Sequence, residues 1–186
     1  MAVDLKRMRF TRADYHRMAQ VGIIKPGARV ELIDGEIIEM SPIGRPHKSS
    51  VDRLNDFFAP RVQGRAIVRV QSSIVLGEYG EPEPDITLLR FRADFYRDSD
   101  EEPGDILLVV EVADTSEGYD RRTKAPMYAR FGIPELWIAD LNRDRVTVYT
   151  DPTPDGYATT RVFRRGESMT PLAFPNLTIL VEEILG

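Results

Sequence analysis

The apolar residues of this chain fall into several short runs, and the most continuous of these covers residues 106–110. Five apolar residues without alternation, between the turn-forming pair Pro103-Gly104 and Asp114, are typical of a central strand that is buried on both faces. Glu111 follows this run directly. Because an unpartnered buried carboxylate costs several kcal/mol, Glu111 needs an ion pair, a hydrogen bond or a metal ion. The pattern alone is equally compatible with a structural ion pair and with a functional carboxylate.

A second carboxylate stands at the start of another predicted strand, which covers residues 86–89. Asp85 precedes this strand, and Pro84 restricts the backbone that leads into it. Two strand-borne carboxylates favour a hard-cation site, because Mg²⁺ is usually held by one or two carboxylates together with water and phosphate oxygens. Lys124 adds a compact positive charge that is able to orient an attacking water or to steady a phosphate oxygen.

Two helices are predicted in the first third of the chain. Thr11, with Asp14 three residues later, is typical of a helix N-cap, and this helix is expected to end near Gly22 and to cover the sheet. The second helix begins around Pro46, because proline is tolerated in a first turn. His47 lies over its apolar face, where a packed side chain is the common outcome, although a helix N-terminus also favours neutral imidazole and anion binding. The apolar face is formed by Val51, Leu54, Phe57, Phe58 and Val62.

A third helix is predicted after the central strand. Thr123 is its expected N-cap, because Pro126 fits only in a first turn. Gly132, followed by Pro134, is expected to end it. This interpretation places Lys124 in the first helical turn, where the helix dipole disfavours a cation and a nearby anion is expected.

The remaining pattern predicts strands. The strongest hairpin signal is Asp34-Gly35, within residues 29–40. Glu31, in the first strand of this hairpin, has apolar neighbours on both faces, which favours a cross-strand salt bridge or a third acid near a metal. A strand over residues 67–75 has Gln71 in its middle, where hydrogen bonding beside the strand ladder is the first interpretation and a contact with the site is the second. Further strands are predicted at residues 135–140, 146–149, 157–163 and 177–181.

Length and composition indicate a globular protein. With 186 residues and 42% hydrophobic residues, one domain over residues 1–186 is expected, with residues 1–10 and 98–105 flexible. The absence of cysteine excludes disulfides, thiolate zinc sites and cysteine nucleophiles. Two histidines exclude a histidine-rich metal site. No apolar run approaches the ~20 residues of a membrane span, and the first residues lack a signal-peptide core, so we expect a cytoplasmic protein without membrane contact.

The charges are unevenly distributed along the chain. A net charge of −5 argues against a surface coated for nonspecific nucleic-acid binding. Acidic residues cluster at 78–85 and at 98–105, and we interpret the second cluster as a solvated loop. Such segregation suits a phosphate-processing site, with acids for a metal and bases for a phosphodiester. The bases that follow the central strand are Arg121, Arg122, Lys124 and Arg130.

Several motifs together resemble a known bacterial family. Pro84-Asp85, Glu111-Val-Ala113 and a downstream lysine look like the PD-(D/E)XK motif of the restriction-endonuclease-like nucleases. A longer combination resembles the family called putative restriction endonucleases, formerly a domain family of unknown function. It extends over roughly residues 10–185 and consists of Arg29-Val-Glu-Leu-Ile-Asp-Gly-Glu-Ile37, Pro84-Asp85, Val109-Val-Glu-Val112, Tyr119-Asp120, Lys124, Tyr128-Ala129 and Gly132-Ile-Pro-Glu-Leu-Trp137.

This resemblance implies a fold and a metal site. The implied fold is α/β (α+β), with a mixed β-sheet flanked by helices and, in this chain, extra C-terminal β-hairpins. The resemblance implies that Asp85, Glu111 and the backbone carbonyl of Val112 hold Mg²⁺, with Mn²⁺ as a substitute. It also implies that a histidine commonly occupies the position of His47.

The chain departs from the common motif at one position. The motif places lysine two residues after the glutamate, and that position is Ala113 here. The resemblance implies that the lysine has moved to the following helix, which makes Lys124 the candidate.

The leading hypothesis is a magnesium-dependent endonuclease that hydrolyses phosphodiester bonds in DNA. Its alternative is a noncatalytic nucleic-acid-binding or protein-interaction module that retains the nuclease fold, motivated by Ala113 and by the acidic net charge. The candidate catalytic residues are Asp85, Glu111 and Lys124, and the further candidates for substrate contact are Glu31, His47, Gln71 and Arg121.

A homodimer is also expected. Duplex DNA presents two strands and one metal site cuts one of them, so a two-fold symmetric pair is the simplest route to paired cleavage. Many proteins of this fold dimerise. The strands at residues 146–149 and 157–163 are the expected contact, because they carry more apolar residues than the predicted helices can cover.

Overall fold

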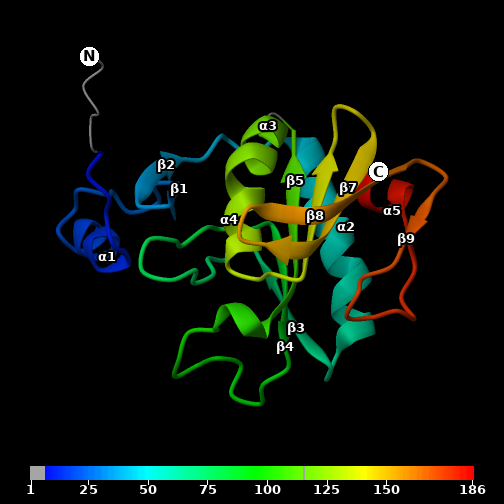
Figure 1. Ribbon diagram of the computed structural model, residues 1–186, viewed down its shortest axis with the longest axis horizontal. Helices are drawn as coiled ribbons and strands as arrows, with labels where there is room; N and C mark the ends of the chain where they lie inside the picture. Colours follow the sequence, from blue (N-terminus) through cyan, green and yellow to red (C-terminus); the bar gives the residue numbers. More distant parts are fainter. Residues whose placement is uncertain (1–6, 115) are drawn as a thin grey trace.

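A six-stranded mixed sheet organises the protein (Figure 1). The computed structural model describes residues 7–114 and 116–186, so the flexibility predicted for residues 1–6 lies outside the described residues. All neighbouring strands are antiparallel except β5 and β6, which are parallel. The predicted α/β (α+β) fold with a helix-flanked mixed sheet is confirmed, and the C-terminal hairpin extends that same sheet. In spatial order the strands are β3 (Ala66–Val70), β4 (Ile86–Arg90), β5 (Ile106–Ala113), β6 (Glu135–Asp140), β7 (Arg145–Thr153) and β8 (Gly156–Arg164).

The parallel pair β5 and β6 requires a crossover connection, and this connection is helical throughout. It consists of α3 (Glu117–Tyr119), a π-helical turn η2 (Asp120–Lys124) and α4 (Ala125–Arg130), without a break. The prediction that Thr123 caps a new helix is therefore wrong, as is the placement of Lys124 in a first turn. The wider π turn shifts the hydrogen-bond register before Pro126, so that the missing N–H of this proline does not end the helix.

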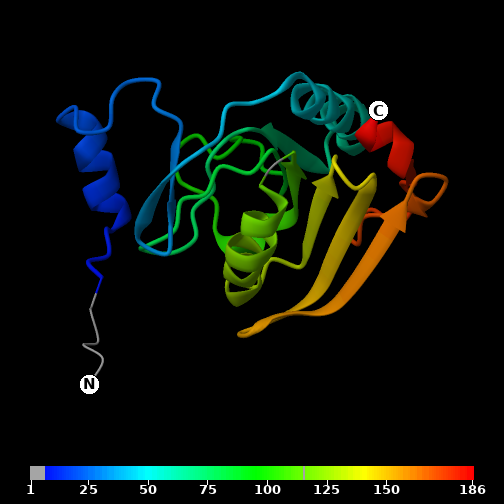
Figure 2. The ribbon, with the colours of Figure 1, turned by 90° about the horizontal axis from the view of Figure 1, so that it is seen from above.

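Two hydrophobic cores lie on the two faces of the sheet. In Figure 2, α2 (Arg45–Val62) lies on one side and α4 on the other. Side chains alternate along a strand, so Val110 and Val112 pack in the core beneath α2, and Val109 and Ala113 pack in the core beneath α4. Glu111 points to the α4 face for the same reason. The short C-terminal helix α5 (Val181–Leu185) adds to the α2 core.

A peripheral unit lies to one side of the sheet (Figures 1 and 2). It contains α1 (Arg12–Gln20), for which Thr11 and Asp14 form the predicted capping box. The expectation that this helix covers the sheet is wrong, because α1 lies to one side and buries none of its residues. It also contains the predicted hairpin of β1 (Val30–Ile33) and β2 (Glu36–Glu39). Its turn residues Asp34 and Gly35 have φ values of 50° and 83°, and a two-residue type I′ turn requires positive φ at both positions.

Two predicted strands are shorter than expected. The strand predicted at 67–75 ends at Val70, because Gln71 has a φ of 44° and leaves the extended conformation. Gln71 therefore follows the strand and is not in its middle. The strand predicted at 177–181 is reduced to β10 (Ile179–Leu180), which pairs with β9 (Ser168–Met169).

The segment 98–105 has one buried side chain, Glu101, so its interpretation as a solvated loop is wrong at that point. Glu101 is 3% exposed and accepts hydrogen bonds from the Arg69 guanidinium and from the backbone N–H of Val75. Residues 98–100 remain exposed. Among the described residues, no helix combines the length and apolarity needed to cross a bilayer.

Candidate active site

A cavity of about 270 Å³ lies between the β1–β2 hairpin, the N-terminal end of α2 and the crossover helix. Its walls come from segments that are far apart in sequence, and they carry more acids than bases. The charged residues and histidine of the lining are Arg29, Glu31, Glu39, His47, Glu83, Asp85, Asp114, Asp120 and Lys124.

Asp85 is held by groups from three different elements. Its Oδ1 accepts a hydrogen bond from Gln71 Nε2 at 3.1 Å. Its Oδ2 accepts from the backbone N–H of Val112 at 2.8 Å and lies 3.1 Å from His47 Nε2. The turn at Gln71 brings this side chain to Asp85, so the second interpretation of Gln71, a contact with the site, describes its position. The carboxylate of Asp85 is thus oriented at the point where β4 begins beside β5.

Lys124 joins two carboxylates that come from different elements. Its Nζ lies 3.2 Å from Glu111 Oε1 and 3.0 Å from Glu31 Oε2. Tyr128 donates its hydroxyl hydrogen to the same Oε1 of Glu111 at 2.6 Å. Glu31 also accepts a hydrogen bond from the backbone N–H of Glu83 at 3.2 Å. Glu31 therefore pairs with Lys124, instead of forming the salt bridge across its own hairpin that one interpretation expected.

The buried charges around Lys124 are not balanced. Glu31, Asp85, Glu111 and Asp120 are each less than 9% exposed, and Lys124 is the buried cation among them. Burial raises the pKa of Glu111 well above its ordinary value, and the attraction of Lys124 opposes this only in part. Burial also raises the pKa of Asp120 to about 6, although Ser116 donates a hydrogen bond to it at 2.7 Å. The cluster therefore favours uptake of a proton or of a cation.

The protonation of Lys124 follows from the same surroundings. Burial by itself would lower the pKa of Lys124, but Glu111, Glu31 and Asp120 together raise it above its ordinary value. Lys124 is consequently a charged ammonium group, and it is suited to electrostatic stabilisation and orientation instead of proton abstraction.

The residue-by-residue reading of the sequence missed Asp120 and Tyr128 as members of this cluster. Both lie on the crossover helix, and with Lys124 they form a series of positions spaced by four residues that face the sheet. Side chains four residues apart lie on one face of a helix, so this spacing was the available signal. The prediction of an N-cap at Thr123 obscured this spacing, because it placed Asp120 outside the helix.

Comparison with known proteins identifies the family. A family model described as "Putative restriction endonuclease", Uma2, matches residues 12–182. The chain belongs to the Uma2 family. A similar solved structure is the crystal structure of a putative nuclease belonging to DUF820 from Anabaena variabilis ATCC 29413, with a TM-score of 0.70 and 18% sequence identity over 95% of this chain and 97% of that chain. At this identity the likeness shows a shared fold. Among curated proteins, no sequence matches this chain significantly.

The remaining candidate residues of this Uma2 protein lie at different distances from the cavity. Asp85, Lys124, Glu31, His47 and the backbone of Val112 belong to its walls. Glu111 lies behind Lys124 and is connected to the cavity through that contact. Arg121 does not line the cavity: its side chain is half exposed and pairs with Glu117 at 3.3 Å.

The oxygen groups of this site fit a hard divalent cation. Within residues 7–114 and 116–186, no three acidic or histidine side chains are grouped to hold a metal ion by themselves. Mg²⁺ does not need such a cage, because water and phosphate oxygens complete its coordination. The backbone N–H of Val112 donates to Asp85, beyond the last β4–β5 pair at Ile86 and Val110. Because the N–H and C=O of one strand residue point to the same side of the strand, the carbonyl of Val112 lies on the β4 side of β5, as Asp85 does. The carboxylate of Asp85, the Val112 carbonyl and the excess buried negative charge therefore suit a divalent cation, whose remaining ligands would be water and phosphate oxygens.

Proposed function

We propose that this Uma2 protein is a metal-dependent endonuclease that hydrolyses phosphodiester bonds in DNA. The observation that carries the proposal is a buried cluster beside the cavity. In this cluster the ammonium group of Lys124 forms ion pairs with Glu31 and Glu111, and Asp85 lines the same cavity as Lys124. Family membership supports a nuclease, and the fold shared with another nuclease-like protein agrees with it.

In this proposal each residue of the cluster has a role. Asp85, Glu111 and the carbonyl of Val112 would hold Mg²⁺, with Mn²⁺ as a substitute. A bound Mg²⁺ lowers the pKa of a coordinated water and neutralises charge on the phosphate. Lys124 contributes a fixed positive charge beside the phosphate and orients the nucleophile. Glu31 and Tyr128 position Lys124 and Glu111 through the contacts described above.

His47 is suited to contact the substrate. Its Nε2 faces Asp85, and its buried Nδ1 has no hydrogen-bond partner within the described part of the chain. A buried nitrogen without a partner is costly, so a phosphate oxygen or a water molecule is a favourable neighbour for it. We assign His47 a role in positioning the scissile phosphate.

Two observations favour a second candidate function. Ala113 stands where the common motif has its lysine, and Lys124 is held in two ion pairs. A protein that binds nucleic acid or another protein without turnover would tolerate both features. The two candidates differ in metal-dependent cleavage.

The deciding experiment is a cleavage assay on a mixture of linear duplex, single-stranded and supercoiled DNA with Mg²⁺ or Mn²⁺. The wild type is expected to cleave, and Asp85→Ala is expected to lose activity by at least 100-fold. Asp98→Ala, which removes a carboxylate from an exposed loop, serves as the matched control and should cleave like the wild type. Calorimetric titration of the three proteins with Mn²⁺ reports cation binding separately. Cleavage that Asp85→Ala leaves unchanged would refute the proposed site.

A further inference from the structure

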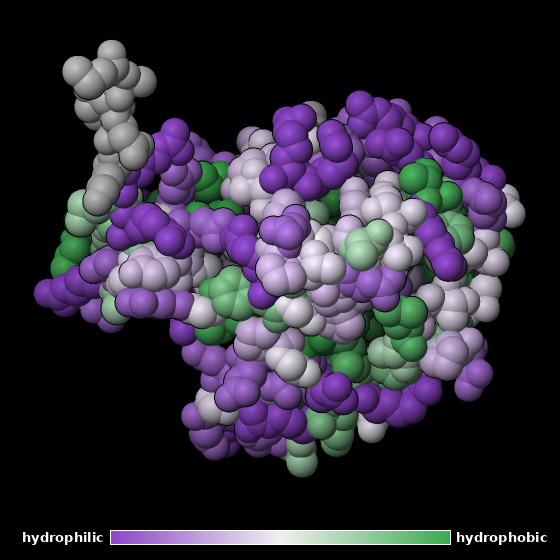
Figure 3. Space-filling model, viewed as in Figure 1, coloured by the Kyte–Doolittle hydropathy of each residue, from purple (hydrophilic) through white to green (hydrophobic). Residues whose placement is uncertain are grey.

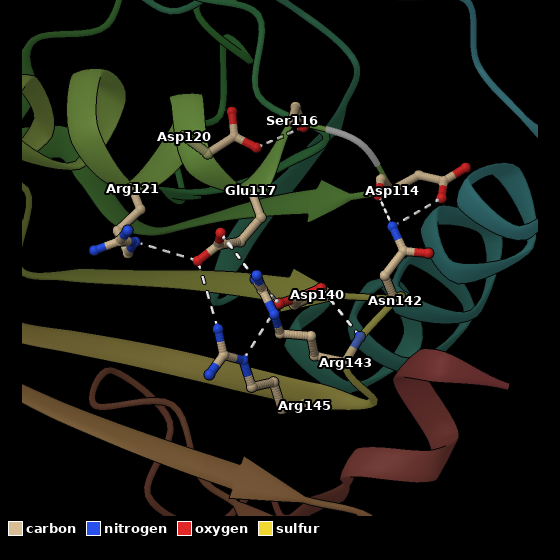
Figure 4. Close-up of polar contacts among 9 residues, drawn as sticks. All are labelled: Asp114, Ser116, Glu117, Asp120, Arg121, Asp140, Asn142, Arg143 and Arg145. Atoms are coloured by element: carbon tan, nitrogen blue, oxygen red, sulfur yellow. Dashed lines mark hydrogen bonds and ion pairs between the residues drawn. The ribbon is translucent and has the colours of Figure 1, made fainter.

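Three arginines gather around two carboxylates at the end of the parallel strands β5 and β6 (Figure 4). Glu117 lies 3.3 Å from Arg121, 3.1 Å from Arg143 and 3.5 Å from Arg145. Asp140, which is 2% exposed, lies 3.1 Å from Arg143 and 3.3 Å from Arg145. This end of a pair of parallel strands is where ligands bind in open α/β sheets.

A fourth arginine lies on the same face of the sheet. Arg164 of β8 is the direct partner of Arg145 in β7, and directly opposed residues of an antiparallel pair project from the same face. Near the other end of this hairpin, Tyr157 donates its hydroxyl hydrogen to the carbonyl of Ile133, which follows the crossover helix. Arg164 is exposed. We call the set Arg121, Arg143, Arg145 and Arg164 the arginine shelf.

The arginine shelf has more positive charge than its own acids neutralise. Arg121, Arg143 and Arg145 share the carboxylates of Glu117 and Asp140, and Glu167 accepts a hydrogen bond from the backbone N–H of Arg164 at 2.6 Å. Four arginines with three carboxylates leave an excess of one positive charge in a chain of net charge −5. The side chains of Arg121 and Arg143 are 50% and 58% exposed. Because a guanidinium has five N–H donors, the one or two carboxylate contacts of Arg121 and Arg143 leave further donors on these exposed side chains. The two acids also hold the guanidinium groups of Arg121, Arg143 and Arg145 in place, which reduces the entropy that a bound ligand would have to remove.

The arginine shelf lies next to the candidate active site. Ser116 and Asp120 line the cavity, and they flank Glu117 and Arg121 in the chain. Figure 4 places Ser116 and Asp120 beside Glu117, on the same side of the sheet as the arginines. In Figure 3, hydrophilic side chains dominate the upper edge of the molecule, over α3 and the ends of the strands. A polyanion with one end in the acid-rich cavity therefore meets positive charge as it leaves.

We propose that the arginine shelf binds the phosphodiester backbone of DNA, a few nucleotides from the phosphate in the cavity. This inference rests on the proposed function, because it extends the substrate of that same site. The guanidinium group of arginine suits phosphate, because two parallel N–H groups donate to two phosphate oxygens. A row of guanidinium groups fits a chain of phosphates better than it fits a single small anion. The arginine shelf would then supply the affinity for DNA that the acid-lined cavity lacks.

The test measures DNA binding without turnover. Fluorescein-labelled 20-nucleotide DNA of mixed sequence, single-stranded or duplex, is titrated by anisotropy in EDTA over a series of salt concentrations. The variants are Arg121→Gln with Arg143→Gln, and Arg164→Gln alone. The control is Arg17→Gln with Arg97→Gln, which removes two exposed arginines elsewhere on the molecule. Thermal melting of each protein shows whether it is folded.

The double variant is expected to bind at least tenfold more weakly, and Arg164→Gln about threefold more weakly. The slope of log K against log salt should become less steep for each phosphate contact that is lost, by about 0.9 with duplex DNA and about 0.7 with single-stranded DNA. The control should match the wild type. Unchanged affinity and slope in both shelf variants, with a wild type that binds and cleaves DNA, would overturn this inference and leave the proposed nuclease intact. A wild type that neither binds nor cleaves DNA would overturn both.

Discussion

Lys124 is the residue on which the candidate site depends. Its ammonium group lies between Glu31 and Glu111 at a position that is 4% exposed. A buried charge of this kind is tolerated only with partners, and removing one partner of a buried pair is expensive. Removing Lys124 should therefore cost more stability than removing the charge of Glu111. Lys124 has two carboxylate partners that would lose their cation, whereas Glu111 is one of several acids around a single lysine.

Replacing Glu111 with glutamine should separate catalysis from folding. In Glu111→Gln, metal-dependent cleavage is expected to fall by at least 100-fold, because one of the two carboxylates that we propose as ligands of the cation is lost. The metal-free protein at pH 8 should be as stable as the wild type or more stable, since burial raises the pKa of Glu111 and its ionised form destabilises the fold. Chemical denaturation measures this. A loss of several kcal/mol would mean that Glu111 is a structural partner of Lys124.

Asp120 should make stability depend on pH. Its pKa rises from the ordinary 3.8 to about 6 in the folded protein, mainly through burial. Between these values the folded state binds more protons than the unfolded state, so this group lowers stability as pH increases from about 4 to about 6. The difference between the two pKa values corresponds to a decrease of roughly 3 kcal/mol in the free energy of unfolding.

Asp120→Asn is therefore expected to be more stable than the wild type above pH 6 and to converge with it near pH 4. Urea denaturation of both proteins in the absence of metal, at intervals of half a pH unit, gives the two profiles. Asp98→Asn, on an exposed loop, is the matched control and should follow the wild type. Parallel profiles for Asp120→Asn and the wild type would show that Asp120 has no raised pKa.

At the scale of elements, the crossover helix positions half of the site. The π turn η2 precedes α4 and leaves Asp120, Lys124 and Tyr128 on the face that meets β5. Such turns within α-helices are frequent at functional sites. Thr123, which lies inside this turn, has no capping role, whereas Thr11 forms a capping box with Asp14.

The two threonines should respond differently to alanine. Thr11→Ala is expected to destabilise α1 by about 1 kcal/mol, because an N-cap side chain is lost. Since α1 buries no side chain fully, the effect should appear as faster hydrogen exchange of the α1 amides. In Thr123→Ala, the free energy of opening of the crossover helix, measured by hydrogen exchange, should stay within about 0.5 kcal/mol of the wild type. Slower exchange of the α1 amides in Thr11→Ala, or an equal loss of opening free energy in both variants, would contradict the assignment of the caps.

At the scale of the whole molecule, the two cores share one sheet. Residues of β5 and β6 belong to the core under α2 and to the core under α4. We therefore predict that the protein unfolds as one domain. Far-ultraviolet circular dichroism and Trp137 fluorescence should give coincident denaturation curves. Two separate transitions would show that the peripheral unit of α1, β1 and β2 folds independently.

The homodimer remains a prediction, and the structure changes its expected contact. Val146, Val148 and Tyr149 are at most 9% exposed, so the first of the two expected strands is covered by its own chain. The second, β8, is the edge of the sheet and carries Val162, which is 44% exposed. A free edge strand of this kind is able to pair with a second copy.

Light scattering at micromolar concentration should give twice the 21.1 kDa mass of one chain. Val162→Lys should lower that mass, because a charge on the edge strand opposes pairing. Thr178→Lys, on a connection outside β8, is the control and should leave the mass unchanged. A mass of one chain for the wild type would reject the dimer and favour nicking or single-strand cleavage.

The sequence by itself determined the local elements and the identity of the acids. The run at 106–110, the Asp34-Gly35 turn and the Thr11 cap depend on residue periodicity and on turn and cap chemistry, which neighbours in the chain specify. Asp85 and Glu111 were recognisable because carboxylates rarely occur where strands are buried. The family resemblance added the fold.

Only the tertiary structure decided which side chains meet. Gln71 reaches Asp85 because the backbone turns at that residue, and Glu31 pairs with Lys124 because the hairpin packs against the crossover helix. Arg121 points to Glu117 and joins arginines of β7 and of the β6–β7 turn. Apart from the local pair of Arg121 and Glu117, these contacts join different elements of the fold. Their formation depends on how the elements pack and on which buried charges find partners, and neither is contained in the local pattern of any one segment.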